Sequence, residues 1–118
     1  MLRTVIDNIP DSIYCKDAAC RKTLANAADV RNMGAKSEAD VLGKDDFAFF
    51  PKEIAEKFFA DDQAVIQTGK PVINREEYIL DEHGKKRWLL TSKLPLRDRD
   101  GQIIGLVGIG RDITERKQ

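Results

Sequence analysis

The last third of the chain carries the strongest constraint on its fold. Three runs of strand length that carry apolar and β-branched side chains, at residues 71–80, 85–96 and 102–112, are separated by the four-residue segments 81–84 and 98–101. Each segment begins with aspartate and ends with glycine, which supplies the positive φ that a tight hairpin needs. Because such runs bounded by turn residues are typical of strands, the pattern predicts three antiparallel strands joined by two hairpins.

The first two thirds of the chain predict helices and a second pair of strands. Apolar residues at helical spacing, proline and glycine punctuation and short alternating runs are the signals used. They predict a helix at residues 2–9, strands at 12–16 and 21–26, a helical stretch at 27–33, a helical turn at 37–40 and a longer helix at 52–68. The order of elements predicts an α+β domain, with a five-stranded antiparallel sheet and helices packed on one face.

The composition excludes several classes of protein. The length of 118 residues and the apolar content of 42% suit one domain with a modest core. Lys plus Arg and Asp plus Glu each number 20, and this balance argues against a dedicated nucleic-acid binder. No apolar run approaches the roughly 18 residues of a membrane span. We expect no nucleic-acid partner, no membrane segment in this stretch, and a cytoplasmic location.

The residues that could carry metal or catalytic chemistry are sparse. Cys15 and Cys20 do not form a CxxC motif, and the only histidine, His83, lies far along the chain. We expect two reduced thiols and no metal site. No nucleophile–base pairing and no phosphate loop of the GxxxxGK type is found, so an enzyme is not supported. The carboxylate pairs at 45–46 and 61–62 are expected to be solvated charges, near helix starts or on an exposed helix face.

The layout resembles a PAS sensory domain over nearly the whole chain. The resemblance is carried by the stretches 9–14, 24–28, 43–47, 88–97, 100–105 and 108–117, the last of which includes the family's Asp-Ile-Thr-Glu-Arg-Lys exit signature. It implies an N-terminal amphipathic helix at 1–9 for dimerisation or cover, a PAS core at 10–114 and the start of a signalling helix at 115–118.

The resemblance also implies a function. PAS domains are non-catalytic modules that sense small molecules, redox state or light, or that dimerise, within histidine kinases, cyclic-dinucleotide enzymes and similar receptors. We therefore expect a fragment of a larger bacterial signalling protein whose output domain it regulates, with a ligand-free interaction module as the alternative. Cys15 and Cys20 lack the Asn-Cys-Arg context of flavin-adduct sensors, and residues 52–68 lack the histidine of heme-binding relatives. No cofactor is expected.

Strand alternation divides the predicted sheet into two faces, because side chains two residues apart point the same way. The more apolar face holds Tyr78, Leu80, Trp88, Leu90, Leu94, Val107 and Ile109, whereas the mixed face holds Arg75, Glu77, Ile79, Leu89, Thr91, Lys93, Leu106, Gly108 and Gly110. Periodicity alone would turn the apolar face toward the core. The resemblance points the other way, since Ile79, Leu89, Thr91 and Gly110 resemble pocket-lining positions of flavin-binding relatives. We expect the second arrangement.

With the mixed face inward, the candidate ligand-binding residues are Arg75, Glu77, Ile79, Leu89, Thr91, Lys93, Gly108 and Gly110. The two glycines would leave room for a ligand. An inward Lys93 or Arg75 is costly without a partner. The partner is either Glu77, as a buried structural ion pair, or a small anionic or polar ligand, and the sequence leaves both open.

Two further sets of residues are expected to serve signalling. The outward apolar face needs a cover, either the 2–9 helix or a second subunit, so a homodimer is expected through Leu2, Val5, Ile6, Ile9, Trp88, Leu90, Leu94, Val107 and Ile109. At the end of the last strand, Asp112 and Thr114 are expected to form a polar hinge and to cap the helix that follows.

Overall fold

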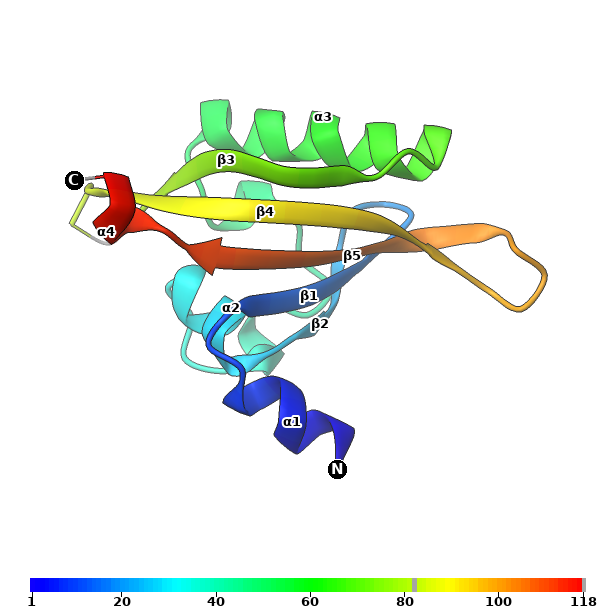
Figure 1. Cartoon of the computed structure of the whole chain (residues 1–118), viewed down its shortest axis with the longest axis horizontal. Coiled ribbons are helices and arrows are strands. Elements are labelled where there is room, and N and C mark those ends of the chain that lie inside the picture. Colours follow the sequence, from blue (N-terminus) through cyan, green and yellow to red (C-terminus); the bar gives the residue numbers. More distant parts are fainter. Residues whose placement is uncertain (82, 118) are drawn as a thin grey trace.

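The computed structural model describes residues 1–81 and 83–117 and has the predicted α+β layout (Figure 1). The elements, in chain order, are α1 (Leu2–Asn8), β1 (Ser12–Asp17), β2 (Lys22–Ala25), α2 (Ala27–Asn32), the 3-10 turns η1 (Glu38–Asp40) and η2 (Asp46–Ala48), α3 (Lys52–Thr68), β3 (Val72–Leu80), β4 (Lys86–Arg97), β5 (Ile103–Asp112) and α4 (Thr114–Lys117). No helix within the described residues is long and apolar enough to cross a membrane.

The strands form one five-stranded antiparallel sheet in the order β2-β1-β5-β4-β3. The β5 strand therefore pairs with β1 on one side and with β4 on the other, which joins the two ends of the chain. Tyr14 lies opposite Gly108, and Thr91 lies opposite Gly110. Because α2, the 3-10 turns and α3 all lie behind the sheet in Figure 1, they enclose one face of it and leave the other open.

The long helix α3 lies between the signals that predicted it. Pro51 precedes it, and Gly69 ends it with φ 75° while its amide donates to the Val65 carbonyl oxygen. The buried stripe consists of Ile54, Ala55, Phe58, Asp62 and Val65. One carboxylate therefore lies among the apolar residues that face the sheet.

The apolar interior is divided between two small clusters. Ala25, Val30, Met33 and Val41 form one cluster around α2, and Ile54, Phe58, Ile79 and Leu89 form the other between α3 and the sheet. Phe50 packs against both. The space between the clusters holds polar side chains.

The N-terminal helix does not cover the sheet. None of the residues of α1 is buried, and α1 lies beside α2 below the β1–β2 side of the sheet (Figure 1). Polar contacts hold it there: the Arg3 guanidinium donates to the Ala25 carbonyl oxygen (2.8 Å) and pairs with Glu38 (2.9 Å). Of the two covers expected from the sequence, the 2–9 helix is therefore wrong, because its polar contacts anchor it at the edge.

Candidate functional site

The mixed face of the sheet points inward. Ile79, Leu89, Thr91 and Lys93 are buried with 8% exposure or less. The orientation suggested by the family resemblance is thus the observed one, and periodicity alone was misleading. The physical reason is that Lys93 has a charged partner on the helix side, so that burying it is tolerated.

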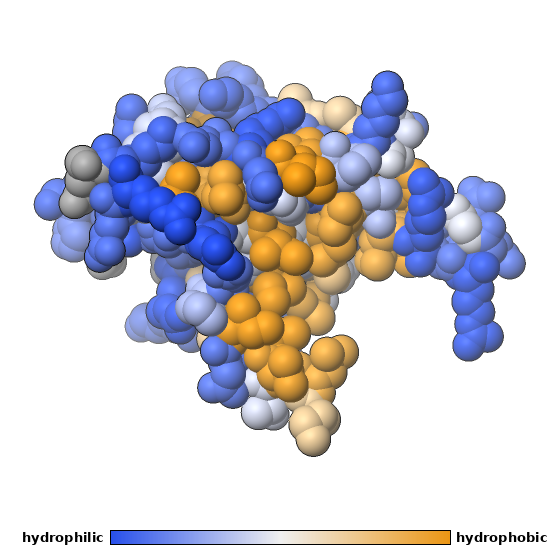
Figure 2. Space-filling model, in the orientation of Figure 1, coloured by the Kyte–Doolittle hydropathy of each residue, from blue (hydrophilic) through white to orange (hydrophobic). Residues whose placement is uncertain are grey.

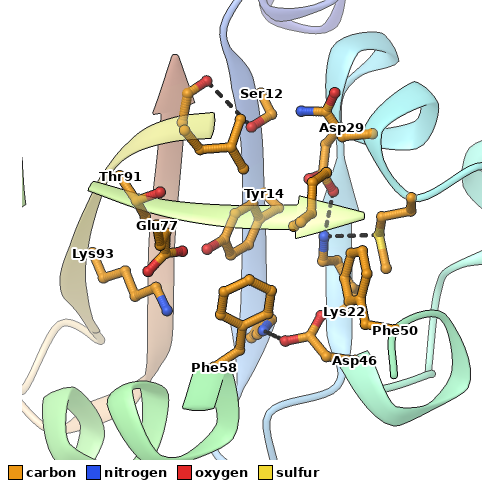
Figure 3. A pocket seen from close by; sticks show the side chains of 16 residues that line it. Ser12, Tyr14, Lys22, Asp29, Asp46, Phe50, Phe58, Glu77, Thr91 and Lys93 are labelled. Atoms are coloured by element: carbon orange, nitrogen blue, oxygen red, sulfur yellow. Dashed lines mark hydrogen bonds and ion pairs between the residues drawn. The ribbon is translucent and has the colours of Figure 1, made fainter. Parts of the chain in front are cut away.

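A small polar cavity lies between this face and the helices (Figure 3). Its volume is about 40 Å³, and it is lined by Ser12, Tyr14, Lys16, Lys22, Asp29, Asn32, Met33, Asp46, Phe50, Phe58, Glu77, Ile79, Leu89, Thr91, Lys93 and Gly110. A larger hollow of about 600 Å³ shares Asn32, Met33, Phe50 and Ile79 with it. These shared residues form the wall between the cavity and the hollow.

Buried ion pairs form the floor of the cavity. The Lys16 Nζ lies 2.7 Å from Asp46 Oδ2 and 2.5 Å from Asp62 Oδ2, while the Lys93 Nζ lies 3.0 Å from Asp62 Oδ1. Asp62 has no exposed surface. Because its carboxylate contacts Lys16 of β1 and Lys93 of β4, it links α3 to both strands. The ion-pair partner of Lys93 is therefore Asp62 and not Glu77, the partner within the protein that was expected from the sequence.

Electrostatics differ between the buried lysines. Burial alone would lower the pKa of Lys16, but Asp46 and Asp62 outweigh it and hold that pKa above its ordinary value. Lys22 contacts only one carboxylate, that of Asp29, and its ammonium lies 4.1 Å from the centre of the Tyr14 ring. There burial prevails, lowering the pKa of Lys22 and raising that of Asp29.

The expectation that both carboxylate pairs are solvated is wrong for one member of each pair. Asp46 is 6% exposed and Asp62 is fully buried, whereas Asp45 and Asp61 are half-buried. Asp45 accepts a hydrogen bond from the Phe47 amide at the start of η2, as a residue near a helix start should. The helical spacing of Asp62 contained the missed signal, because it lies four residues after buried Phe58.

Arg75 does not reach the cavity. Arg75 follows the bulge between Val72 and Arg75, at which Asn74 has φ 51°, and keeps the inward register of β3 opposite buried Thr91. Its side chain is 47% exposed and pairs with Asp61 of α3 at 2.6 Å. This ion pair at the edge strand, and not a change of face, keeps the guanidinium out of the cavity lining.

The two glycines of β5 make room for protein side chains. A Cβ at Gly108 would lie 2.1 Å from the Tyr14 ring, and one at Gly110 would lie 2.9 Å from the Ser12 Oγ. The space that we expected a ligand to use at Gly108 is thus filled by Tyr14. Gly110 does line the cavity.

Glu77 and Thr91 stand side by side at the cavity wall (Figure 3). Burial raises the pKa of Glu77, although Lys93 and Thr91 partly offset the effect. The Thr91 hydroxyl helps to hold the Glu77 charge, yet its buried oxygen has no hydrogen-bond partner of good geometry in the described part of the chain. These are the two predicted site residues that present polar atoms to the cavity without an ion-pair partner there.

The end of β5 is fastened to β4 by polar contacts. Asp112 Oδ1 accepts hydrogen bonds from the Thr114 amide (2.9 Å) and hydroxyl (2.6 Å), and the Thr114 Oγ1 accepts from the Trp88 amide (2.9 Å). The Ile113 amide donates to the Trp88 carbonyl oxygen at 2.8 Å. Burial opposes ionisation of Asp112, but Thr114 and Arg87 outweigh it and lower its pKa. We call Trp88, Asp112, Ile113 and Thr114 the exit clamp.

The outer face of the sheet and α1 share one apolar surface. Figure 2 shows apolar side chains running from the strands down to the N-terminal helix. Leu94 and Ile109 on the strands are 37% and 39% exposed, and Leu2 and Val5 on α1 are 75% and 48% exposed. Trp88 is more protected, because its ring packs on Tyr78 and lies under the Lys117 ammonium.

Metal or redox chemistry has little support in the described residues. They hold no group of three or more histidine, cysteine, aspartate or glutamate side chains able to bind a metal ion. Cys15 is half-buried and Cys20 is buried, and both are free thiols.

Comparison with known proteins decides the family. A sequence profile of the PAS fold family matches residues 6–118. The chain belongs to the PAS fold family. The PAS domain is 34% identical over 116 residues to the methanogenesis regulatory histidine kinase FilI of Methanothrix harundinacea, covering 98% of this chain and 13% of that protein. It is 28% identical to a diguanylate cyclase of Vibrio cholerae, covering 94% of this chain and 35% of the relative.

Solved structures agree with this assignment. VqmA bound to DPO superposes with a TM-score of 0.84 at 28% identity, covering 96% of the PAS domain and 56% of VqmA. The chain thus spans a minor part of the curated relatives, whose kinase and cyclase activities are named for whole proteins. In each of these relatives the matched region is one part of a longer protein.

Proposed function

We propose that this PAS domain is a sensory module that binds a small polar ligand in its central cavity and regulates an attached output domain, without catalytic activity of its own. The relatives support the second part, because they are a histidine kinase and a diguanylate cyclase much longer than this chain. The structure of VqmA bound to DPO supports ligand binding by a protein that shares this fold.

One observation carries the proposal: the same strand pair lines the cavity and forms the exit clamp. Leu89 and Thr91 of β4 face the cavity, and their partners across the ladder are Asp112 and Gly110 of β5. Trp88, next to Leu89, bonds to Ile113 and Thr114. A shift of β4 caused by an occupant would therefore reach the clamp within two residues, as a population shift between two strand–helix arrangements.

The cavity limits the size of the ligand. Its 40 Å³ holds about three water-sized groups, far below the roughly 300–1,000 Å³ of a typical drug-sized site. A ligand of a few non-hydrogen atoms fits directly. A larger one has to displace Phe50 and Met33 toward the adjoining hollow.

We further propose that two copies of the domain pair through the apolar surface formed by α1 and the outer face of β4 and β5. Leu94, Ile109, Leu2 and Val5 are all more than one-third exposed there. A contiguous apolar surface of this kind favours association. An identical second copy offers the same surface and so matches it by two-fold symmetry.

The test is a pair of measurements on this chain. Native mass spectrometry detects a small molecule retained through purification. Amide spectra recorded during titration with polar fragments of up to about six non-hydrogen atoms then report on coupling. We expect fragments that shift the amides of Ser12 and Thr91 to shift those of Trp88 and Thr114 as well. Cavity shifts without any change at the clamp would refute transmission.

The second candidate is a ligand-free interaction module. The observation that favours it is the filling of the interior by protein groups, since Tyr14 and the ion pairs of Lys16 and Lys93 occupy most of the space. No retained molecule and no cavity shift with any fragment would support this reading over the sensory one.

A further inference from the structure

The charges around the cavity are almost, but not completely, paired. Three ammonium groups are buried there, and each contacts a carboxylate: Lys16 contacts Asp46 and Asp62, Lys22 contacts Asp29, and Lys93 contacts Asp62. Each oxygen of Asp62 lies within ion-pair distance of a different lysine, although Oδ1 accepts no hydrogen bond of good geometry from the described residues. None of these buried cations is left for an anionic ligand.

The acidic side chain left over is that of Glu77. It lines the cavity from β3 and makes no ion pair with any described residue. Beside it, the Thr91 side chain is 3% exposed and its oxygen has no good hydrogen-bond partner. The polar groups left to face the cavity from β3 and β4 are therefore the Glu77 carboxylate, which only accepts and carries negative charge, and the Thr91 hydroxyl, which can accept as well as donate.

We propose that the cavity selects small ligands that carry N–H donors, cationic ones above all, and rejects carboxylates, with Glu77 and Thr91 as the specificity-determining residues. The inference rests on the proposed sensory function and narrows its ligand class. Amidinium and ammonium groups match a carboxylate beside a hydroxyl, because they offer several donors and a compensating charge. Phe58 and Tyr14, which also line the cavity, supply aromatic surfaces suited to a flat cation.

A carboxylate ligand meets the opposite situation. It would lie near Glu77, which repels it, and it could gain a cation only by taking Lys93 or Lys16 from Asp62. Asp62 would then keep its own charge in a fully buried position with fewer partners. The sequence-based expectation of an anionic ligand is therefore replaced by the opposite preference.

The test uses three probes of one planar, four-atom shape: acetamidinium, acetamide and acetate. Each is titrated into this chain at constant ionic strength while the amide shifts of Ser12, Thr91 and Gly110 are followed. We expect acetamidinium to bind at least ten-fold more tightly than acetate, with acetamide between them. In the Glu77→Gln variant, the affinity for acetamidinium should fall to that for acetamide. Glu76 is the outward neighbour of Glu77 on the same strand, and Glu76→Gln should leave the order of the three affinities unchanged.

The outcomes separate this inference from the function on which it rests. Acetate binding as tightly as acetamidinium, or an unchanged preference in a folded Glu77→Gln variant, overturns the charge preference and leaves a ligand-binding cavity in place. No shift of the cavity amides with any of the three probes overturns both. Amide spectra of each variant establish that it has folded before the titrations are compared.

Discussion

Lys16 on β1 and Asp62 on α3 lie 46 positions apart and meet with their charged atoms 2.5 Å apart, both with 2% exposure or less. Asp62 also holds Lys93 of β4. One carboxylate thus ties the long helix to two strands that do not neighbour each other in the sheet. The helix is positioned over the cavity by charge as well as by apolar packing.

Removing that carboxylate should destabilise the domain severely. Asp62→Ala leaves Lys93 buried without its partner and Lys16 with only one, and breaking a buried pair in this way costs about 3–5 kcal/mol. Urea denaturation measures the free energy of unfolding. Asp61→Ala is the matched control, since its partner Arg75 is 47% exposed and the loss should stay below about 1 kcal/mol. Equal losses in the two variants would show that the buried pairs add no more stability than the exposed pair does.

How far the sequence predicted this structure depends on which signals are local. The local signals located the sheet and the long helix. They are the pattern of strand residues, the glycines in the hairpins, and Pro51 and Gly69 at the two ends of the helix. The partners of Lys16 and Lys93 could not be found this way, because Asp46 and Asp62 approach them only in three dimensions. Even there, the position of Asp62 on the buried stripe of α3 was a usable signal.

The missed features of the sheet have a similar explanation. Arg75 keeps the inward register but pairs with Asp61 of α3 at the edge strand, and no local pattern in β3 reveals that partner. Gly108 was expected to leave room for a ligand, but the room belongs to Tyr14, which pairs with it across the ladder. Contacts between different elements, rather than patterns within one strand, decide both cases.

The contact between Gly108 and Tyr14 leads to a second prediction. A methyl group at position 108 would overlap the Tyr14 ring, so Gly108→Ala should cost about 1–3 kcal/mol of stability through overpacking. Gly110→Ala should cost less, because the nearest atom is the Ser12 hydroxyl oxygen, which can rotate away. In a Tyr14→Ala background, most of the cost at position 108 should vanish in a denaturation cycle. An undiminished cost there would exclude the ring as its cause.

The exit clamp predicts a pH dependence. The pKa of Asp112 is lower in the folded domain than its ordinary value of about 3.9. At pH values between these two pKa values, the unfolded chain therefore binds more protons than the folded domain. The contribution of Asp112 is therefore present at neutral pH and is lost as pH falls through the folded pKa. Asp112→Asn should cost less than about 1 kcal/mol at pH 7, since Asp112 and Arg87 are both partly exposed.

Denaturation of the parent domain and of the Asp112→Asn variant, measured at a series of acidic pH values, checks this prediction. Their unfolding free energies should converge as the pH drops below the ordinary aspartate value. If the difference in unfolding free energy between Asp112→Asn and the parent domain persists unchanged at low pH, the charge of Asp112 is not what stabilises the clamp.

The apolar surface leads to a prediction about assembly. Ile109 is 39% exposed at the middle of the outer face, and Leu90 lies on the neighbouring strand. A carboxylate in either place would bring a charge into the proposed dimer interface, where it would lie unpaired against apolar side chains. Ile109→Glu and Leu90→Glu should each sediment as monomers at concentrations where the parent domain is dimeric.

Leu42→Glu is the matched control, because Leu42 is equally exposed at 39% but follows η1 on the helix side of the sheet. A dimer that survives both sheet substitutions would exclude this surface, and its loss in Leu42→Glu alone would move the interface to the helix side.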